Sequence, residues 1–290
     1  MVRSRVVNAS NRLSSFLICA LAIIGSASPV LARPARLHLK SAPIELVRDK
    51  NGNPVASIDG ELLSDNWSGY VLSSAYTKQN YKSASATWVV PEVTYDGIQS
   101  ISANWIGIGG FCKSKIKHER CKPDKTLIQM GTYQAAYSDD DIEYYAWYEK
   151  IPASSVPIET IDVSPGDTIT ASLSCSGKCK NPQQWTLSIE DVTNSQSWSQ
   201  VFTYQSSKRS VDFIEEAPSS GGGILPLADF DKTFFSASVA NGDSVNLDDA
   251  IGLEMEDPQG QFSSISPPDM SKDGFAACFS DSGLVDCTDP

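Results

Sequence analysis

The chain has 290 residues, with 23 Lys and Arg against 35 Asp and Glu, a formal net charge of −12 and two histidines. Only 3 acidic residues lie in residues 1–60 against 8 basic ones, so residues 61–290 carry a formal charge of −17. Such a surface repels nucleic acid and anionic lipid, and we expect neither as a partner. With so few histidines and no metal-ligand cluster, we predict no metal and no cofactor, which leaves carboxylates and amides to carry any chemistry.

Residues 1–32 have the pattern of a secretory signal peptide. Three arginines precede an apolar stretch from Phe16 to Gly25, and Val30-Leu31-Ala32 fits a small-residue cleavage site. Later segments fall short of the roughly 20 apolar residues that a membrane helix needs. We therefore predict a secreted protein, extracellular or periplasmic, without a membrane span, and we expect a monomer.

Residues 33–60 are basic and contain three prolines and a turn cluster over residues 49–54. Two interpretations remain open. The segment is either a short pro-segment, which could lie on the acidic domain and block a groove, or a linker without fixed structure.

Residues 61–290 are predicted to form one all-β domain, a single β-sandwich. Short stretches rich in β-branched and aromatic residues alternate with turn signals such as Asp96-Gly97 and Pro165-Gly166-Asp167. Helical periodicity is absent, and about 225 residues suit one sandwich or barrel. The predicted strands cover residues 83–90, 101–108, 126–137, 142–149, 168–173, 185–192 and 198–204.

Six cysteines remain after the predicted signal peptide, in three close pairs. Six cysteines allow 15 connectivities, and the sequence alone does not choose among them. Proximity favours three local loops, and in an exported protein such loops are disulfides rather than a zinc site. The pairs are Cys112 with Cys121, Cys175 with Cys179, and Cys278 with Cys287.

Strand alternation groups the polar side chains of three segments by face, because residues two apart point to the same side. Glu143, Tyr145, Trp147 and Glu149 share one face, a mixture of aromatic rings and carboxylates that suits the floor of a binding groove rather than a core. In the same way Gln129 shares a face with Leu127, Gly131 and Tyr133, and Glu216 with Asp212 and Ile214. Taken alone, Gln129 is more typical of a buried structural hydrogen-bonding group.

Six motifs in a fixed order change that interpretation. Together they resemble the glutamic peptidases, or eqolisins, secreted acid proteases of fungi and some bacteria. The resemblance covers roughly residues 65 to 255; each motif is weak alone, but the combination is specific. The motifs are Asn66-Trp67-Ser68-Gly69-Tyr70, Trp105-Ile106-Gly107-Ile108-Gly109-Gly110, Leu127-Ile128-Gln129-Met130-Gly131, Tyr145-Ala146-Trp147-Tyr148-Glu149, Asp212-Phe213-Ile214-Glu215-Glu216 and Ser244-Val245-Asn246-Leu247-Asp248-Asp249-Ala250.

The resemblance implies two curved antiparallel sheets of the concanavalin type, a substrate groove and a Gln/Glu catalytic dyad. Matched by motif, the dyad is Gln129 and Glu216; Glu215 points to the opposite face of a regular strand. The remaining groove residues are Trp67, Trp105, Trp147 and Glu149. One departure is Gly109, where fungal relatives carry an aspartate; another is Tyr145, where an acidic residue is expected. The substrate would be a protein or peptide, cleaved at acidic pH.

Two rival functions remain from the residues alone. Serine or cysteine hydrolase chemistry needs a base, usually histidine, and His118 lies in a charged, cysteine-flanked loop. A carbohydrate-active enzyme or lectin-like module is the stronger alternative, because aromatic strips stack on sugars and paired glutamates hydrolyse glycosides. Gln129 separates the hypotheses, because a glycosidase has no particular need of it.

Overall fold

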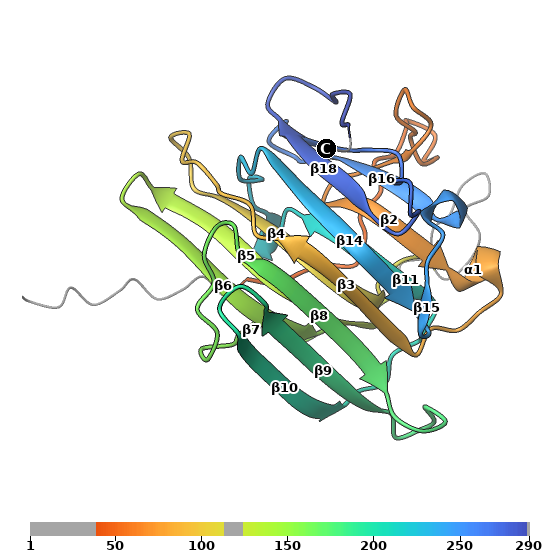
Figure 1. Ribbon diagram of the computed structural model, residues 1–290. Coiled ribbons are helices and arrows are strands. Elements are labelled where there is room, and N and C mark those ends of the chain that lie inside the picture. Colours follow the sequence, from red (N-terminus) through yellow and green to blue (C-terminus); the bar gives the residue numbers. More distant parts are fainter. Residues whose placement is uncertain (1–38, 113–123, 289–290) are drawn as a thin grey trace, which may run out of the picture. The chain divides into compact units, whose positions relative to one another are not determined.

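The computed structural model describes residues 39–112 and 124–288, and nearly all regular structure in them is β (Figure 1). Helical structure in these residues is limited to α1 (Ser74–Thr77) and the 3-10 turn η1 (Leu247–Asp249). Strands alternate with turns along the whole described chain, as the sequence predicts. Within these ranges no helix has the length and apolar character needed to cross a bilayer.

Sixteen strands are hydrogen-bonded in one continuous order that folds into two layers. Layer A contains β16 (Ile251–Glu256), β2 (Trp67–Ser73), β11 (Ser210–Glu216), β4 (Ser100–Gly109), β5 (Leu127–Ser138), β6 (Asp141–Lys150) and β7 (Val156–Pro157), with β1 (Leu62–Ser64) paired to β16. Layer B contains β10 (Gln196–Thr203), β9 (Gln184–Asp191), β8 (Thr168–Cys175), β3 (Ser83–Val89), β14 (Lys232–Ala240), β18 (Phe275–Ser280) and β17 (Phe262–Ile265), with β15 (Asp243–Ser244) paired to β14. A separate hairpin joins β12 (Ser219–Ser220) to β13 (Gly223–Ile224).

The predicted sandwich is confirmed, and the two layers are joined through the antiparallel pair β16–β17. Pairing is antiparallel throughout layer A except at its edge, where β1 runs parallel to β16. The predicted strands match β3, β4, β5, β6, β8, β9 and β10 to within about three residues at each end, the usual uncertainty of strand boundaries.

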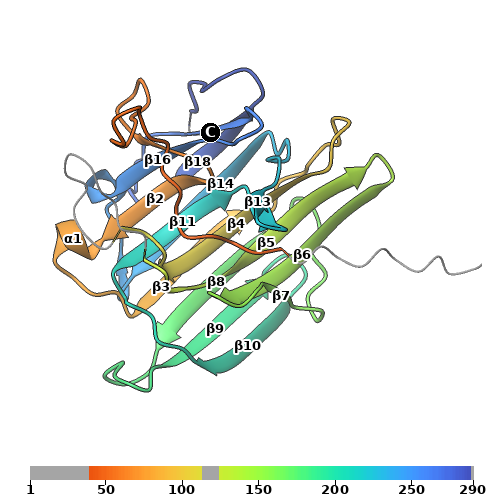
Figure 2. The ribbon, with the colours of Figure 1, turned by 180° about the vertical axis from the view of Figure 1, so that it is seen from behind.

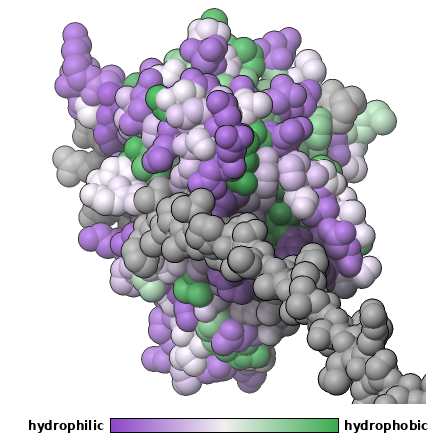
Figure 3. Space-filling model, turned by 90° about the vertical axis from the view of Figure 1, so that its left-hand side faces the viewer, coloured by the Kyte–Doolittle hydropathy of each residue, from purple (hydrophilic) through white to green (hydrophobic). Residues whose placement is uncertain are grey.

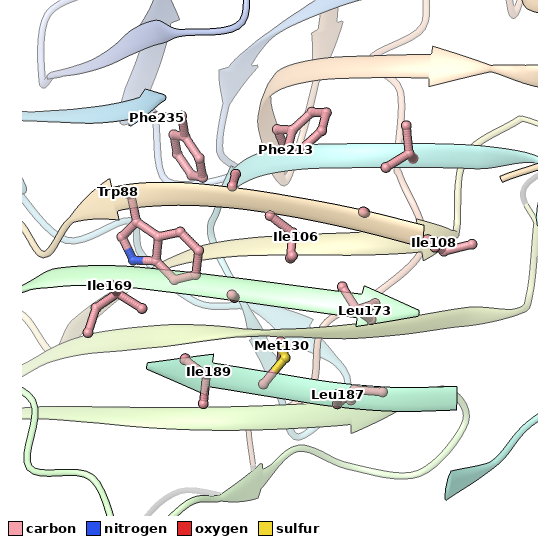
Figure 4. Close-up of a cluster of buried hydrophobic side chains, with 14 of the residues drawn as sticks. Trp88, Ile106, Ile108, Met130, Ile169, Leu173, Leu187, Ile189, Phe213 and Phe235 are labelled. Atoms are coloured by element: carbon pink, nitrogen blue, oxygen red, sulfur yellow. The ribbon is translucent and has the colours of Figure 1, made fainter. Parts of the chain in front are cut away.

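The core between the layers consists of alternate residues of the facing strands. In β8 and β9 buried and part-exposed residues alternate, as expected for strands with one face on a core. Trp88 also donates its indole N–H to Thr132 of the opposite layer at 3.0 Å. Figure 4 shows the centre of this core, in which layer A contributes Ile106, Ile108, Met130 and Phe213 and layer B contributes Trp88, Ile169, Leu173, Leu187, Ile189 and Phe235.

Layer A is buried on its outer face as well. The first ten residues of β5 and all of β4 are buried, whichever face they point to. A second apolar cluster accounts for this: it contains Trp67, Trp105, Leu127, Tyr133 and Trp147 of the outer face together with Leu39, Ile44 and Leu46. Figure 2 shows the red-orange start of the described chain crossing β11, β4 and β5 on this side.

Two of the three predicted disulfide loops are confirmed. Cys175 is bonded to Cys179 and Cys278 to Cys287, each closing a loop of a few residues. Cys112 is also disulfide-bonded, and the predicted pairing with Cys121 falls on a residue outside the described ranges. On the face drawn in Figure 3 hydrophilic residues predominate and hydrophobic ones form only small patches, in keeping with the acidic composition.

Gly131 leaves the space that Trp105 fills on the outer face, and this predicts a stability effect. A Cβ at position 131 would overlap the backbone carbonyl of Asn104 and lie 2.6 Å from the Trp105 Cβ. Overpacking of this kind destabilises a protein by about 1–3 kcal/mol or more. We therefore expect Gly131→Ala to lower the urea midpoint of unfolding. Gly223→Ala is the matched control, since nothing lies within 4 Å of its added Cβ; equal midpoints for the two variants would contradict this account.

Candidate active site

The outer face of layer A brings together the residues that the sequence motifs single out. In the register, Gln129 of β5 is opposite Gly107 of β4 on one side and Glu149 of β6 on the other. Glu216, the last residue of β11, is opposite Ala103, two residues along β4 from Trp105. The predicted face assignments are confirmed, because Leu127, Tyr133, Tyr145, Trp147 and Ile214 all belong to the outer cluster.

Glycines on the neighbouring strands make room for the Trp105 ring. Gly131 is directly opposite Trp105, and a Cβ on Gly107 would lie 2.7 Å from Cζ3 of the ring. Trp105 is thus fixed between Gln129 and Glu216, and Trp67 meets its ring edge-on with the centroids 4.9 Å apart. Gly109 has a φ of 97°, and a Cβ there would overlap the carbonyl oxygen of Thr126. An aspartate at this position would therefore be strained in this structure.

Glu216 is fully buried, and both its carboxyl oxygens have a hydrogen-bond donor. The Trp105 indole N–H donates to Oε2 at 2.7 Å, and the backbone N–H of Ala42 donates to Oε1 at 3.3 Å. Burial raises the pKa of Glu216 well above its ordinary range, and the neighbouring Glu149 raises it further. Both effects favour the protonated, neutral form of the carboxyl group.

Glu149 forms a side-chain pair with Gln129 and is also fully buried. The Gln129 amide Nε2 donates to Glu149 Oε2 at 2.9 Å, and the backbone N–H of Ser41 donates to the same oxygen at 3.0 Å. Burial raises the pKa of Glu149 to about 8, although these hydrogen bonds lower it. The site therefore holds two interacting carboxyl groups rather than one.

Trp147 lies on the same face, stacked on the Tyr133 ring with the centroids 4.5 Å apart. Gln129 Oε1, Glu149 Oε1 and Trp147 Nε1 are buried polar atoms without a hydrogen-bond partner in the described part of the chain. Buried polar atoms are normally paired, so unpaired ones gathered on one face indicate a place for water or a ligand. All six predicted site residues thus lie on one face, and the roles assigned to them remain proposals.

The segment that covers this face agrees with one of the two alternatives for residues 33–60, but its residues were not among the predicted site residues. Ser41 is fully buried, with its backbone N–H on Glu149, and the next residue contacts Glu216. The Ser41 hydroxyl lies close enough to both carboxyl groups to lower their pKa, although its oxygen forms no hydrogen bond of regular geometry. The basic charge of residues 33–60 was the available signal for contact with the acidic domain, whereas Ser41 and Ala42 themselves form no distinguishing pattern.

Glu215, the neighbour of Glu216, points to the opposite side of β11. It lies among core residues and accepts a hydrogen bond from the Asn104 side chain. Burial raises the pKa of Glu215 to about 8, while hydrogen bonds from Ser102 and Ala103 lower it. Two adjacent glutamates thus occupy separate environments, and only Glu216 reaches the outer face.

Comparison with known proteins identifies the family of this chain. The sequence profile of the peptidase A4 family matches residues 65–274. The chain belongs to this family. It is therefore a peptidase, as the resemblance predicts. The matched range contains β2, β4, β5, β6 and β11, and with them every strand that contributes to the site.

Two curated proteins are similar to this chain over most of their length. Aspergillopepsin-2 of Aspergillus niger is 27% identical over 242 residues, which cover 78% of this chain and 82% of the relative. Scytalidopepsin B of Scytalidium lignicola is 28% identical over 225 residues, which cover 73% of this chain and 74% of the relative.

Solved structures of glutamic peptidases share the fold. Scytalido-glutamic peptidase with a transition state analog inhibitor aligns with a TM-score of 0.57 at 22% identity, over 74% of this chain and 98% of that structure. Aspergilloglutamic peptidase from Aspergillus niger aligns with a TM-score of 0.50 at 22% identity, over 62% of this chain and 99% of that structure. These likenesses support the same β-sandwich architecture.

The buried Glu215 predicts a loss of stability with rising pH. Because its folded pKa is about 8 against an ordinary value of 4.5, the unfolded chain releases this proton first as the pH rises. The folded state is then disfavoured by up to about 1.4 kcal/mol for each pH unit between the two values. Glu215→Gln should therefore flatten the decline of the unfolding free energy from about pH 4.5 to about pH 8. The exposed Glu190, changed to Gln, is the control, and an unchanged slope in Glu215→Gln would count against the assignment.

Proposed function

We propose that this chain is a secreted endopeptidase that hydrolyses proteins or peptides at acidic pH through Gln129 and Glu216. One observation carries the proposal: Gln129, Glu149, Trp105 and Glu216 converge on the outer face of layer A, within reach of a single extended peptide. The two glutamic peptidase relatives support the same reaction.

In the proposed reaction, Glu216 acts as general base and then as general acid. The ionised carboxylate removes a proton from water, whose oxygen attacks the scissile carbonyl carbon and forms a tetrahedral intermediate. The protonated carboxyl then donates this proton to the amide nitrogen, the C–N bond breaks, and the amine leaves. The Ala42 N–H on Glu216 Oε1 supports this geometry, because it is a peptide nitrogen held at the carboxyl group.

Gln129 would stabilise the negative charge of the intermediate. One N–H of its amide Nε2 is engaged by Glu149 Oε2, which leaves the second N–H for an oxyanion. Such a donor contributes roughly 3–4 kcal/mol of transition-state stabilisation when it is already oriented. Glu149 is thus a positioning residue, since its hydrogen bond fixes the direction of the Gln129 amide.

The substrate-binding surface would be the aromatic outer face. Trp67, Trp105 and Trp147 are large and rigid, and Trp147 and Trp67 keep a free indole N–H in the described part of the chain. An extended peptide can pack on such rings and pair its own N–H groups with the carboxyl groups. Secretion is proposed from residues 1–32 and is in keeping with the disulfides at Cys175 and Cys278.

The dyad predicts large rate losses in two single variants with intact folds. Gln129→Ala should lower kcat on a denatured protein substrate by roughly 10²–10³. Glu216→Gln should lower it by roughly 10²–10⁴ or more, because it removes the proton carrier. The measurement is hydrolysis at acidic pH by preparations with the same N-terminus, checked by intact mass.

Two neighbouring residues provide matched controls for these variants. Gln134 is a buried glutamine of β5 that pairs with Ser102 on the core side, and Glu215 adjoins Glu216 on β11. Gln134→Ala and Glu215→Gln should change stability while the folded protein keeps its kcat. Full activity of Gln129→Ala or Glu216→Gln would refute the dyad. Polysaccharide turnover without peptide hydrolysis would establish the carbohydrate-active alternative instead.

A further inference from the structure

Tyr133 of β5 lies in the same transverse row of the outer face as Glu216. Both residues are directly opposite Ala103 of β4 in the antiparallel register, Glu216 from one side and Tyr133 from the other. Residues opposite each other in antiparallel strands point to the same face, so the two side chains flank the small side chain of Ala103. The strands β11, β4 and β5 lie side by side in Figure 2. Tyr133 is thus a neighbour of the proposed base, one strand away.

Two aromatic side chains of β6 hold the Tyr133 ring in place. Trp147 stacks on the ring with the centroids 4.5 Å apart. Tyr145, directly opposite in the register, packs against it at 5.4 Å with the ring planes tilted by 51°. Tyr133 is also completely buried, at 0% exposure. A ring with these contacts has little rotational freedom, so its hydroxyl group is fixed in position before a substrate binds.

The Tyr133 hydroxyl is a buried donor with no hydrogen-bond partner among the described residues. Burial raises the pKa of the phenol well above its ordinary range, and the charges of Glu149 and Glu216 raise it further. The phenol therefore keeps its proton at acidic and neutral pH and can donate it in a hydrogen bond. Buried hydroxyl groups normally have a partner, so a fixed, protonated and unpaired one is a donor available to a bound ligand.

The Ser41 hydroxyl marks where an acceptor oxygen of a ligand would stand. Ser41 is fully buried and its backbone N–H donates to Glu149 at 3.0 Å. Its hydroxyl lies close enough to the Tyr133 phenol to lower the pKa of that group, as it does for Glu149 and Glu216. An oxygen atom at this place lies beside the proposed base and beside the carboxyl group that orients Gln129. The oxygens of a tetrahedral intermediate need a donor in such a place.

We propose that Tyr133 is a third catalytic residue, whose phenol O–H donates to the oxyanion of the tetrahedral intermediate together with the second N–H of Gln129. The inference deepens the proposed function and rests on it. Two donors directed at one oxygen form an oxyanion hole, which stabilises the charge that develops when water attacks a peptide carbonyl. The proton of that water goes to Glu216 and from there to the leaving amine. Tyr133 therefore keeps its own proton, and its covalent bonds are unchanged throughout.

The test removes the hydroxyl and keeps the ring. Tyr133→Phe should lower kcat for an internally quenched peptide at acidic pH by roughly 10²-fold, as expected for the loss of one oxyanion donor. KM should stay close to the wild-type value, because the lost interaction is made in the transition state. The midpoint of thermal unfolding should not fall, since the hydroxyl has no partner within the described ranges. Preparations with the same N-terminus are compared, as for the Gln129 and Glu216 variants.

Tyr70 provides the matched control. It is a buried tyrosine of β2 on the core side of layer A, and its hydroxyl donates to the Ser266 carbonyl at 2.8 Å. Tyr70→Phe should lower the unfolding midpoint, because it removes this hydrogen bond, and should leave kcat unchanged. The two variants thus separate a catalytic hydroxyl from a structural one. A wild-type kcat for Tyr133→Phe, in an enzyme that Gln129→Ala and Glu216→Gln do slow, would overturn this inference and leave the peptidase proposal intact.

The pH dependence of kcat distinguishes an oxyanion donor from a donor to Glu216. Because the phenol stays protonated, Tyr133→Phe should lower kcat by the same factor at every acidic pH. A hydrogen bond to the Glu216 carboxylate would instead lower the pKa of that group in the wild type, and its loss would raise the pKa. Activity that depends on the ionised base would then rise at a higher pH in Tyr133→Phe. Such a shift, with a wild-type rate at its upper end, would refute the role in the oxyanion hole.

Binding of a transition-state mimic tests the same contact without turnover. A phosphinic peptide carries a charged tetrahedral phosphorus group where the substrate has its scissile carbonyl. Calorimetry should show that it binds Tyr133→Phe at least about tenfold more weakly than the wild type, and Tyr70→Phe as tightly as the wild type. Equal affinities of wild type and Tyr133→Phe would contradict the proposal. If the wild type neither cleaves peptides nor binds the phosphinic peptide, the peptidase proposal fails and this inference fails with it.

Discussion

Burial of two carboxyl groups on the outer face of layer A is the constraint on which the rest of the site depends. A buried carboxylate without partners is strongly disfavoured, so each group must be neutral, hydrogen-bonded or both. Glu216 is held by Trp105 and by a backbone N–H, and Glu149 by Gln129 and another backbone N–H. Gly131 and Gly107 leave the space that the Trp105 side chain occupies beside Glu216. Fold and site are therefore specified by the same residues.

Strand periodicity explains how neighbouring residues of one strand can belong to the core and to the proposed site. Successive residues of β11 alternate between the two faces, so Phe213 and Glu215 enter the core while Ile214 and Glu216 reach the outer face. A shift of register by one residue would exchange the two glutamates. The pairing of β11 on both edges, with β2 and β4, fixes this register along the whole strand.

The sequence predicted seven of the strands, β3 to β6 and β8 to β10, and the faces of Gln129, Trp147 and Glu216, because each depends on local alternation with a period of two. It also predicted two short disulfide loops from spacing alone. It did not predict how far Glu216 lies from Gln129 along the sheet, since the offset between β11 and β5 is a long-range property set by β4 between them. The position of residues 39–46 was left between two alternatives for a similar reason. The basic charge of the segment indicates attraction to the acidic domain. The face of the domain that it contacts depends on apolar side chains such as Ile44, whose partners lie far along the chain.

The covering segment and the acid–base chemistry are coupled through solvation. With residues 39–46 in place, burial raises the pKa of Glu216, so the carboxyl group keeps its proton at acidic pH and cannot accept one from water. Hydration of the carboxyl group would relieve the desolvation that raises its pKa. A pKa of Glu216 closer to its ordinary range would let the group act as a base under the acidic conditions proposed for the enzyme. The proposed role of Glu216 as a base therefore depends on how much water reaches the outer face of layer A.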